Sequence, residues 1–178
     1  MSTLPGFWHG AAALSGRLDL SLARQSDTRL AALSDSQLRS AGVCDRHRHR
    51  LRSAPTLSTS HSAITLDDAI YPEHLAAIPC APPVLFYRGE LSLIAEPSVA
   101  IIGARRCTQR GRQLANQLAR GLSATGLVVV SGLAYGIDEA AHEANPGRSI
   151  AVLGQGLEAP MSSRQNSSVQ TILEAGGL

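Results

Sequence analysis

Val99-Ala-Ile-Ile-Gly-Ala-Arg105 is the stretch that decides the fold. Its short apolar run ends in glycine, which is typical of a buried strand in a parallel sheet. A helix is predicted to follow from about Gln109 to Ala124, because Leu114, Leu118 and Leu122 recur every four residues with two alanines beside them. The stretch therefore predicts a β-α unit whose helix lays one apolar face on the sheet.

Two similar units follow, so the chain is expected to contain, in order, strand 99–103, helix 109–124, strand 127–130, helix 138–144, strand 149–153 and helix 163–175. Thr108 and Asp138 are placed to cap the first two helices, and Gly126 to end the first. This alternation predicts the α/β class, with a partial Rossmann-like parallel sheet in the order β-α-β-α-β-α. In the usual doubly wound order the first strand lies at the centre, with the second and third strands on one side and the fourth on the other. The chain supplies only the first three, so residues 99–103 would form an edge strand, which invites association.

Ligands of such sheets bind beyond the carboxyl ends of the strands. Glycines in the loops at those ends let backbone amides approach a ligand closely. An arginine beside a helix N-terminus suits a phosphate group, and an exposed tyrosine can stack on a base. The candidate binding residues are Gly103, Arg105, Arg106, Ser131, Gly132, Tyr135, Gly136, Gly154 and Gly156. Alternatively, Arg105 is a surface residue of an ordinary turn and Tyr135 packs on the rim of the sheet.

Asp138 and His142 are four residues apart and share a helix face. As an acid–base pair they would need a nucleophile or a bound water, and the sequence offers none. We therefore expect Asp138, His142 and Thr108 to fix the loops structurally, and we expect no catalytic residue and no enzyme activity.

Gly154-Gln-Gly-Leu-Glu-Ala159 fits the G-x-G-x-x-A pattern of dinucleotide sites. Such a site also needs an acid at the end of a following strand, and no strand precedes Glu174, which has the right offset. No cofactor is therefore expected. The cysteines, Cys44, Cys80 and Cys107, are odd in number and widely spaced, which indicates reduced thiols in a cytoplasmic protein without a metal site.

Three regions are expected: a small helical region over 1–60, a proline-rich linker over 61–97, and the Rossmann-like part over 98–178. Ser34 and Gln37 resemble a capping box in the first region. The run Arg46-His-Arg-His-Arg-Leu-Arg52 is basic, and a solvated helix face is favoured over a contact with DNA. The formal charge is only +2, so any nucleic-acid surface must be a local patch. No apolar run is long enough to span a membrane.

Residues 99–105, 130–138 with Ala141-His142, and 150–158 resemble the core of the DNA-processing protein A (DprA/Smf) family in order and spacing. The string S-G-L-A-x-G-I-D-x-x-A-H is the most specific part of this resemblance. The segments 71–75 and 82–89 resemble the lead-in to that core, and the helical region is compatible with a sterile-alpha-motif-like domain.

The resemblance implies a protein that binds single-stranded DNA, protects incoming DNA in natural transformation, and helps load the RecA recombinase in DNA recombination. It also implies a cytoplasmic homodimer without catalytic activity. Arg105 would hold a phosphate, while Gly103, Ser131 and Gly132 would shape the pocket floor. The alternatives are a Rossmann protein that binds or hydrolyses a nucleotide-derived small molecule, and an inactive truncated product.

The sequence also departs from the family pattern. The turn between His142 and Ser149 is short, and residues 159–166 lack the usual tyrosine and displace the asparagine to Asn166. The chain stops at Leu178, so the family's Phe-Pro-x-Arg-Asn-Arg motif is absent, and we expect a domain truncated within its Rossmann-like part.

Overall fold

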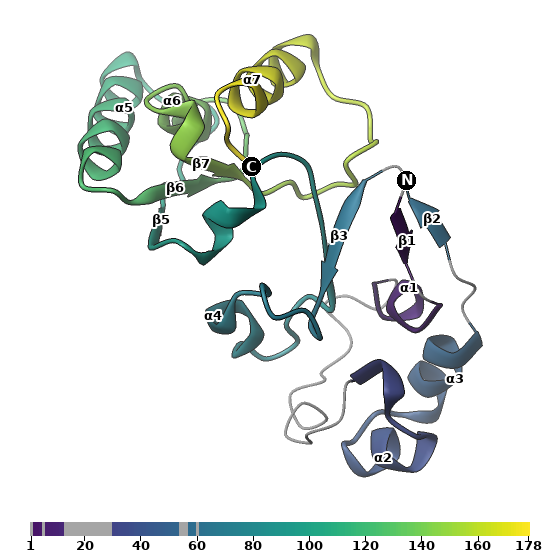
Figure 1. Ribbon diagram of the computed structural model, residues 1–178. Helices are drawn as coiled ribbons and strands as arrows, with labels where there is room; N and C mark the ends of the chain where they lie inside the picture. Colours follow the sequence, from purple (N-terminus) through teal and green to yellow (C-terminus); the bar gives the residue numbers. More distant parts are fainter. Residues whose placement is uncertain (1, 5, 13–29, 54–56, 60) are drawn as a thin grey trace. The chain divides into compact units, whose positions relative to one another are not determined.

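The computed structural model describes residues 2–4, 6–12, 30–53, 57–59 and 61–178 of the chain (Figure 1). It divides into two compact units, Met1–Phe86 and Tyr87–Leu178. None of the helices in the described residues has the length and apolar character needed to cross a membrane.

The first unit is built mainly from short helices and two small sheets. Its elements are β1 (Ser2–Leu4), α1 (Gly6–Ala12), the 3-10 helix η2 (Leu30–Ala32), α2 (Asp35–Ser40), α3 (Asp45–Ser53), β2 (Leu57–Thr59), β3 (Ser62–Thr65), α4 (Glu73–Ala76) and β4 (Val84–Tyr87). β1 pairs with β2 in an antiparallel sheet, and β3 pairs with β4. The proline-rich segment thus carries regular elements of its own, which proline permits at strand starts and helix N-termini.

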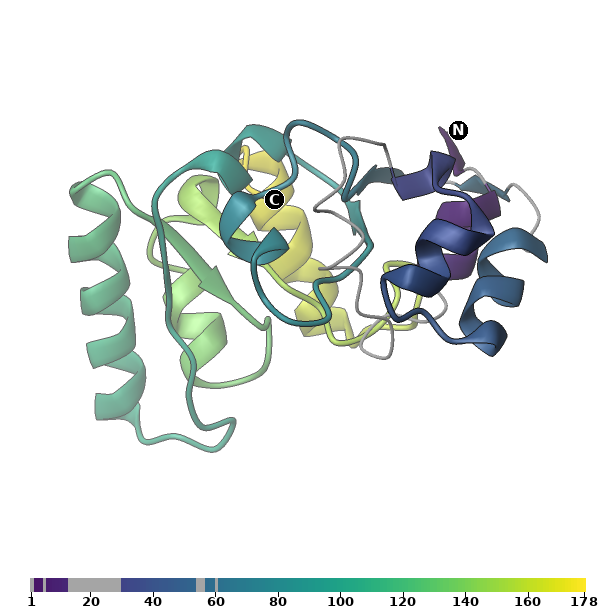
Figure 2. The ribbon, with the colours of Figure 1, turned by 90° about the horizontal axis from the view of Figure 1, so that it is seen from below.

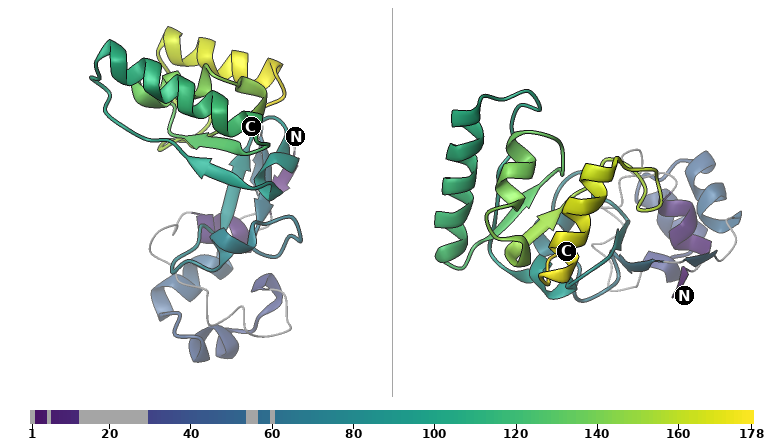
Figure 3. Two further views of the ribbon diagram at one scale, coloured as in Figure 1. Left: turned by 90° about the vertical axis from the view of Figure 1, so that its left-hand side faces the viewer. Right: turned by 90° about the horizontal axis from the view of Figure 1, so that it is seen from above.

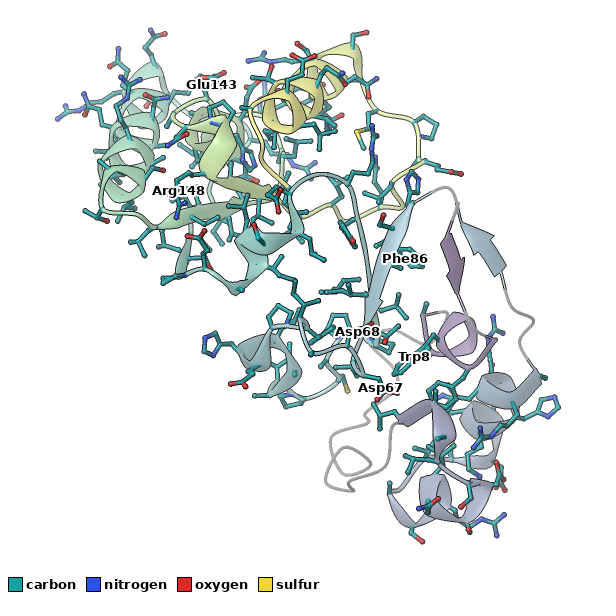
Figure 4. The ribbon with its side chains drawn as sticks, in the orientation of Figure 1. Trp8, Asp67, Asp68, Phe86, Glu143 and Arg148 are labelled. Carbon is teal, nitrogen blue, oxygen red and sulfur yellow. The ribbon has the colours of Figure 1, made fainter. Side chains whose placement is uncertain are left out.

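Local capping explains where α2 begins and ends. The Ser34 hydroxyl accepts from the Gln37 backbone amide at 3.2 Å, and the Gln37 side chain accepts from the Ser34 amide at 2.8 Å, which confirms the predicted capping box. Gly42, with φ of +82°, ends the helix, and the Val43 amide donates to the Leu38 carbonyl at 3.0 Å. Asp67, labelled in Figure 4, accepts from the first amide of η2 at 2.9 Å.

The second unit has the predicted β-α-β-α-β-α order. Its elements are η3 (Leu91–Ala95), β5 (Ser98–Ala100), α5 (Gln109–Ala124), β6 (Val128–Ser131), α6 (Ile137–His142), η4 (Pro146–Arg148), β7 (Ser149–Ala151) and α7 (Ser163–Glu174). The strands form a parallel sheet in the order β5-β6-β7, which confirms the α/β class and the Rossmann-like arrangement. Thr108 accepts from the Gly111 amide at 3.1 Å and caps α5 as predicted, and Gly126 follows the helix with φ of +91°.

The three helices α5, α6 and α7 lie on one face of this sheet (Figures 1 and 3). They follow one another across it in chain order (Figure 2). Each crossover steps in the same direction along the sheet, and right-handed crossovers then put every helix on the same side. The core between the layers contains Ala119, Val129 and Ala141.

In the described residues, backbone pairing beyond the three strands occurs beside β7, whereas the doubly wound order puts a fourth strand beside the first. Leu178, which follows α7, donates to the Ser149 carbonyl at 3.0 Å and accepts from the Ala151 amide at 2.8 Å. It therefore pairs with the outer side of β7. β5 lies at the other edge of the described sheet, as expected, and is shorter than predicted because regular pairing ends after Ala100.

The buried face of α5 differs from the predicted leucine face. Ala115 and Ala119, which belong to the predicted apolar face, are buried together with Ser123, whereas Leu114 and Leu118 are 55% and 52% exposed. Small side chains let the helix approach the sheet closely. Leu114 and Leu118 each precede a buried alanine by one residue, so they lie on a neighbouring side of the helix, which the described sheet does not cover.

Candidate functional site

The loops after β5 and β6 meet at the carboxyl edge of the sheet. The Gly103 amide donates to Asp138 Oδ1 at 3.2 Å, and the Ile137 amide donates to the Ala104 carbonyl at 3.3 Å. The Ser131 hydroxyl donates to the Ile101 carbonyl at 2.6 Å. These three bonds hold the two loops in a single arrangement.

Asp138 is not the N-cap of α6, contrary to prediction. The helix begins at Ile137 with Gly136 in the capping position, and no side chain caps it. Asp138 lies buried within the first turn, where its carboxylate binds the first loop instead. A buried carboxylate needs hydrogen-bond donors, and the Gly103 amide in the loop after β5 is one of them.

Two of the candidate glycines are required by close contacts between the loops. At Gly136, φ is +91°, and a Cβ would lie 2.4 Å from the Ala104 oxygen and 2.7 Å from the Arg105 oxygen. At Gly103, a Cβ would lie 2.7 Å from the Ile137 side chain. Glycine at these positions therefore allows the two loops to touch. A Cβ at Gly154 or Gly156 would meet nothing within 4 Å, and both residues are exposed.

His142 lies at the other end of α6 and does not fix the loop as expected. Its Nδ1 makes a short hydrogen bond with Ser149 Oγ at the start of β7, so it ties the helix to the third strand. The ring is buried, and burial lowers its pKa from 6.5 to about 4, although the nearby Asp138 acts in the opposite direction. Burial therefore favours the neutral form of the imidazole.

Arg105 and Arg106 are exposed at the end of the first loop. Among the described residues, no carboxylate lies within ion-pair distance of either guanidinium. Both side chains lie in the loop that leads to the N-terminus of α5, so their charge is available to an anion from solution.

Tyr135 joins the loop after β6 to the start of α7. Its ring is 41% exposed, and its hydroxyl hydrogen bonds with Ser162 Oγ at 2.7 Å. The Arg164 guanidinium lies 5.7 Å from the centre of the ring. Ser162 and Arg164 belong to residues 159–166, the segment that departs from the family pattern. Asn166, the last residue of this segment, donates to the Met161 carbonyl at 3.4 Å.

A charge network beside this loop was not found from the sequence. Glu139 is buried and binds Arg164, while Arg112 donates to Glu139 Oε2 at 2.8 Å. Arg112 also binds Glu143, labelled in Figure 4, at 3.0 Å, and the Gly136 carbonyl at 3.2 Å. A glutamate in the first turn of an alanine-rich helix is the signal that could have revealed it, because its buried charge requires cationic partners.

The electrostatics of the network agree with this geometry. Burial acts to raise the pKa of Glu139, but the hydrogen bonds from Arg112 and Arg164 outweigh it, so the pKa is lowered. The bond to Glu139 raises the pKa of Arg112. These two arginines are therefore committed to structure, in contrast to Arg105 and Arg106.

The family model for DNA recombination-mediator protein A matches residues 62–178. This chain belongs to that family. The DNA processing protein DprA of Streptococcus pneumoniae is 48% identical over 96 residues, which cover 52% of this chain and 33% of that protein. Protein Smf of Escherichia coli is 36% identical over 121 residues, which cover 66% of this chain and 32% of that protein. The chain thus spans about a third of the length of these relatives.

Solved structures agree with the assignment. The X-ray structure of DprA from S. pneumoniae matches with a TM-score of 0.65 and 25% identity, over 95% of this chain and 65% of that one. The DNA processing protein A of Helicobacter pylori, whose single-stranded DNA binding mode has been described, matches with a TM-score of 0.55 and 30% identity, over 67% of this chain and 55% of that one.

Proposed function

We propose that this chain binds single-stranded DNA at the carboxyl edge of the β5-β6-β7 sheet and takes part in DNA processing as a recombination mediator. Within this proposal, Arg105 and Arg106 contact phosphates and Tyr135 stacks on a base. Gly103, Ser131, Gly132 and Gly136 shape the surface, and the exposed Gly154 and Gly156 border it. The protein acts without catalysis.

The observation that carries the proposal is that Arg105 and Arg106, which have no ion-pair partner among the described residues, lie on a loop whose backbone is hydrogen bonded to the next loop. The loop backbone is held by Asp138 and by the Gly136 contact, while the two guanidinium groups remain unpaired within the described chain. A preorganised cationic loop of this kind suits a phosphate backbone. Few side chains at this edge could read base edges, so binding should show little sequence preference.

Fluorescence anisotropy with a labelled oligothymidylate tests the proposal. Affinity should fall steeply with salt, with a slope of about −0.7 in log K against log salt for each phosphate contact. Arg105→Ala should weaken binding about tenfold or more, since a charge-assisted bond contributes roughly 1.5–3 kcal/mol. Arg88→Ala, which removes an exposed arginine from outside the loops, should have a much smaller effect.

Equal losses from the Arg105 and Arg88 variants would show that the loop is not the binding surface. Affinity independent of salt, or tighter binding to duplex, would refute the preference for single strands. A mononucleotide that competes at micromolar concentration would instead favour a small-molecule site.

The finer role is also a proposal: protection of incoming DNA during natural transformation in the cytoplasm, and assistance in loading a RecA recombinase as a homodimer. Nuclease protection of a single-stranded oligonucleotide by the chain, and stimulation of RecA filament formation, are the corresponding assays. Failure of the RecA assay with intact DNA binding would remove only this finer role.

A further inference from the structure

The α2–α3 hairpin of the first unit carries a concentration of positive charge. Residues 35–53 contain five arginines and two aspartates, a formal charge of +3, whereas the whole chain carries +2. The proposed site at the loops of the second unit does not use this charge.

The arginines of α3 fall into two groups that the structure separates. Arg48 is buried; it donates to Asp35 at 3.2 Å and to the Val43 carbonyl at 2.6 Å, and it binds Asp45. Arg52 binds the Leu33 carbonyl and lies 5.7 Å from the centre of the Phe7 ring. These two side chains hold the hairpin together.

The second group of arginines is Arg46 and Arg50, and His49 lies beside them; all three residues are exposed. Their spacing puts them on one side of the helix, with Arg46 and Arg50 about 6 Å apart along its axis. Neither arginine has an ion-pair partner among the described residues. We call Arg46, His49 and Arg50 the outer basic face of α3.

The two carboxylates of the hairpin form their ion pairs with arginines outside this face. Asp35 binds Arg48 and lies 3.9 Å from Arg52, and Asp45 binds Arg48 and lies 3.8 Å from Arg39. Like charges four residues apart repel, and Arg46 lies in the first turn of α3, where the helix dipole disfavours a cation. An external anion would relieve both effects.

We propose that the outer basic face of α3 is a second contact surface for the phosphate backbone of single-stranded DNA. This inference rests on the proposed function and extends it to the first unit. The partner is a polyanion with closely spaced charges, since two guanidinium groups four residues apart can each engage a phosphate of one strand. No base-reading group lies in this face, so the contact adds affinity without sequence preference.

The test compares full-length variants that remove two charges each. Arg46→Gln/Arg50→Gln should bind a long labelled oligothymidylate on the order of tenfold more weakly at 0.1 M salt, and the salt slope should fall by about 1.4. The matched control is Arg88→Gln/Arg120→Gln, which removes two exposed arginines from the second unit and should change the slope far less. Neither pair makes an ion pair in the described chain, so both variants should keep the stability of the parent.

Equal affinities and slopes for the two double variants would overturn the inference while leaving the loop site intact. A loss in the α3 variant with none in Arg105→Ala would support the α3 surface and refute the loop site. Absence of binding by the parent chain would refute both. Unchanged DNA binding with loss of binding to anionic phospholipid vesicles would assign the face to a membrane surface and overturn the inference.

Discussion

Gly136→Ala tests whether the contact between the first two loops organises the candidate site. The backbone at Gly136 has φ of +91° and ψ of −116°, a conformation that side chains disfavour by roughly 1–3 kcal/mol. The new Cβ would also lie 2.4 Å from the Ala104 oxygen, so one loop must move, at a further cost of about 1–3 kcal/mol. The sum, about 2–6 kcal/mol, is a large part of the stability of an ordinary domain.

Two other glycines separate these contributions. Gly126 has φ of +91° but nothing within 4 Å of a Cβ, so Gly126→Ala should lose only about 1 kcal/mol. Gly154 has neither feature, so Gly154→Ala should be neutral or stabilising by up to about 1 kcal/mol, because alanine restricts the unfolded chain.

Urea denaturation followed by circular dichroism gives the free energy of unfolding of each variant. Anisotropy with an oligonucleotide, measured where the variants remain folded, gives their affinity for DNA. We expect stability to decrease in the order Gly154→Ala, Gly126→Ala, Gly136→Ala, with the largest loss of affinity in the last. A Gly136→Ala variant as stable as Gly126→Ala would refute the argument that the close approach requires glycine.

Three further outcomes are expected. Lowering the pH from 6.5 to 4 should destabilise the fold by up to about 3 kcal/mol through His142, because the imidazole is protonated below pH 6.5 in the unfolded chain but only below about pH 4 in the native protein. Urea denaturation at both pH values should show a smaller change for His142→Gln than for the parent. An unchanged pH dependence in His142→Gln would show that this histidine is not the group responsible. Glu139→Gln should lower the free energy of unfolding by about 1–3 kcal/mol through loss of two charged hydrogen bonds. Glu143→Gln removes an exposed carboxylate and should lower it by under about 1 kcal/mol. Equal thermal denaturation midpoints for the two variants would show that burial of Glu139 is unimportant. Hydrogen exchange should be slower at the Ile101 amide, which donates to the Val130 carbonyl at 3.0 Å, than at the Ala100 amide, which by the alternation along β5 faces away from β6. Protection of Ala100 that rises with protein concentration would show pairing between edges of two chains.

Local signals in the sequence were sufficient for the ends of α2 and α5. Thr108 caps α5 as predicted because a threonine hydroxyl reaches the amide three residues on, whatever the rest of the chain does. Ser34 with Gln37 and the glycine after α5 are equally local. The family assignment was also available from sequence, since the string from Ser131 to His142 carries it.

Interactions between residues far apart in the sequence could not be predicted from local patterns. Asp138 looked like a helix cap, but its partner is the Gly103 amide, 35 residues away. The predicted apolar face of α5 combined leucines with alanines, but only the alanines are buried, because exposure depends on which side of the helix the sheet covers. Glu139 joins arginines from α5 and α7, and no short-range pattern connects those three positions.

The sequence by itself determined the class of fold, the order of its strands and helices, and the family, because hydrophobic spacing, capping residues and a contiguous motif are all read within a few neighbouring positions. The tertiary structure alone decided that all three helices cover one face (Figure 1), that Leu178 pairs with β7, and which arginines have ion-pair partners among the described residues. Pairing between strands and between charged side chains depends on which distant groups meet when the chain folds. Arg105 differs from Arg112 because Glu139 and Glu143 bind the second, whereas no carboxylate in the described part of the chain lies within ion-pair distance of the first.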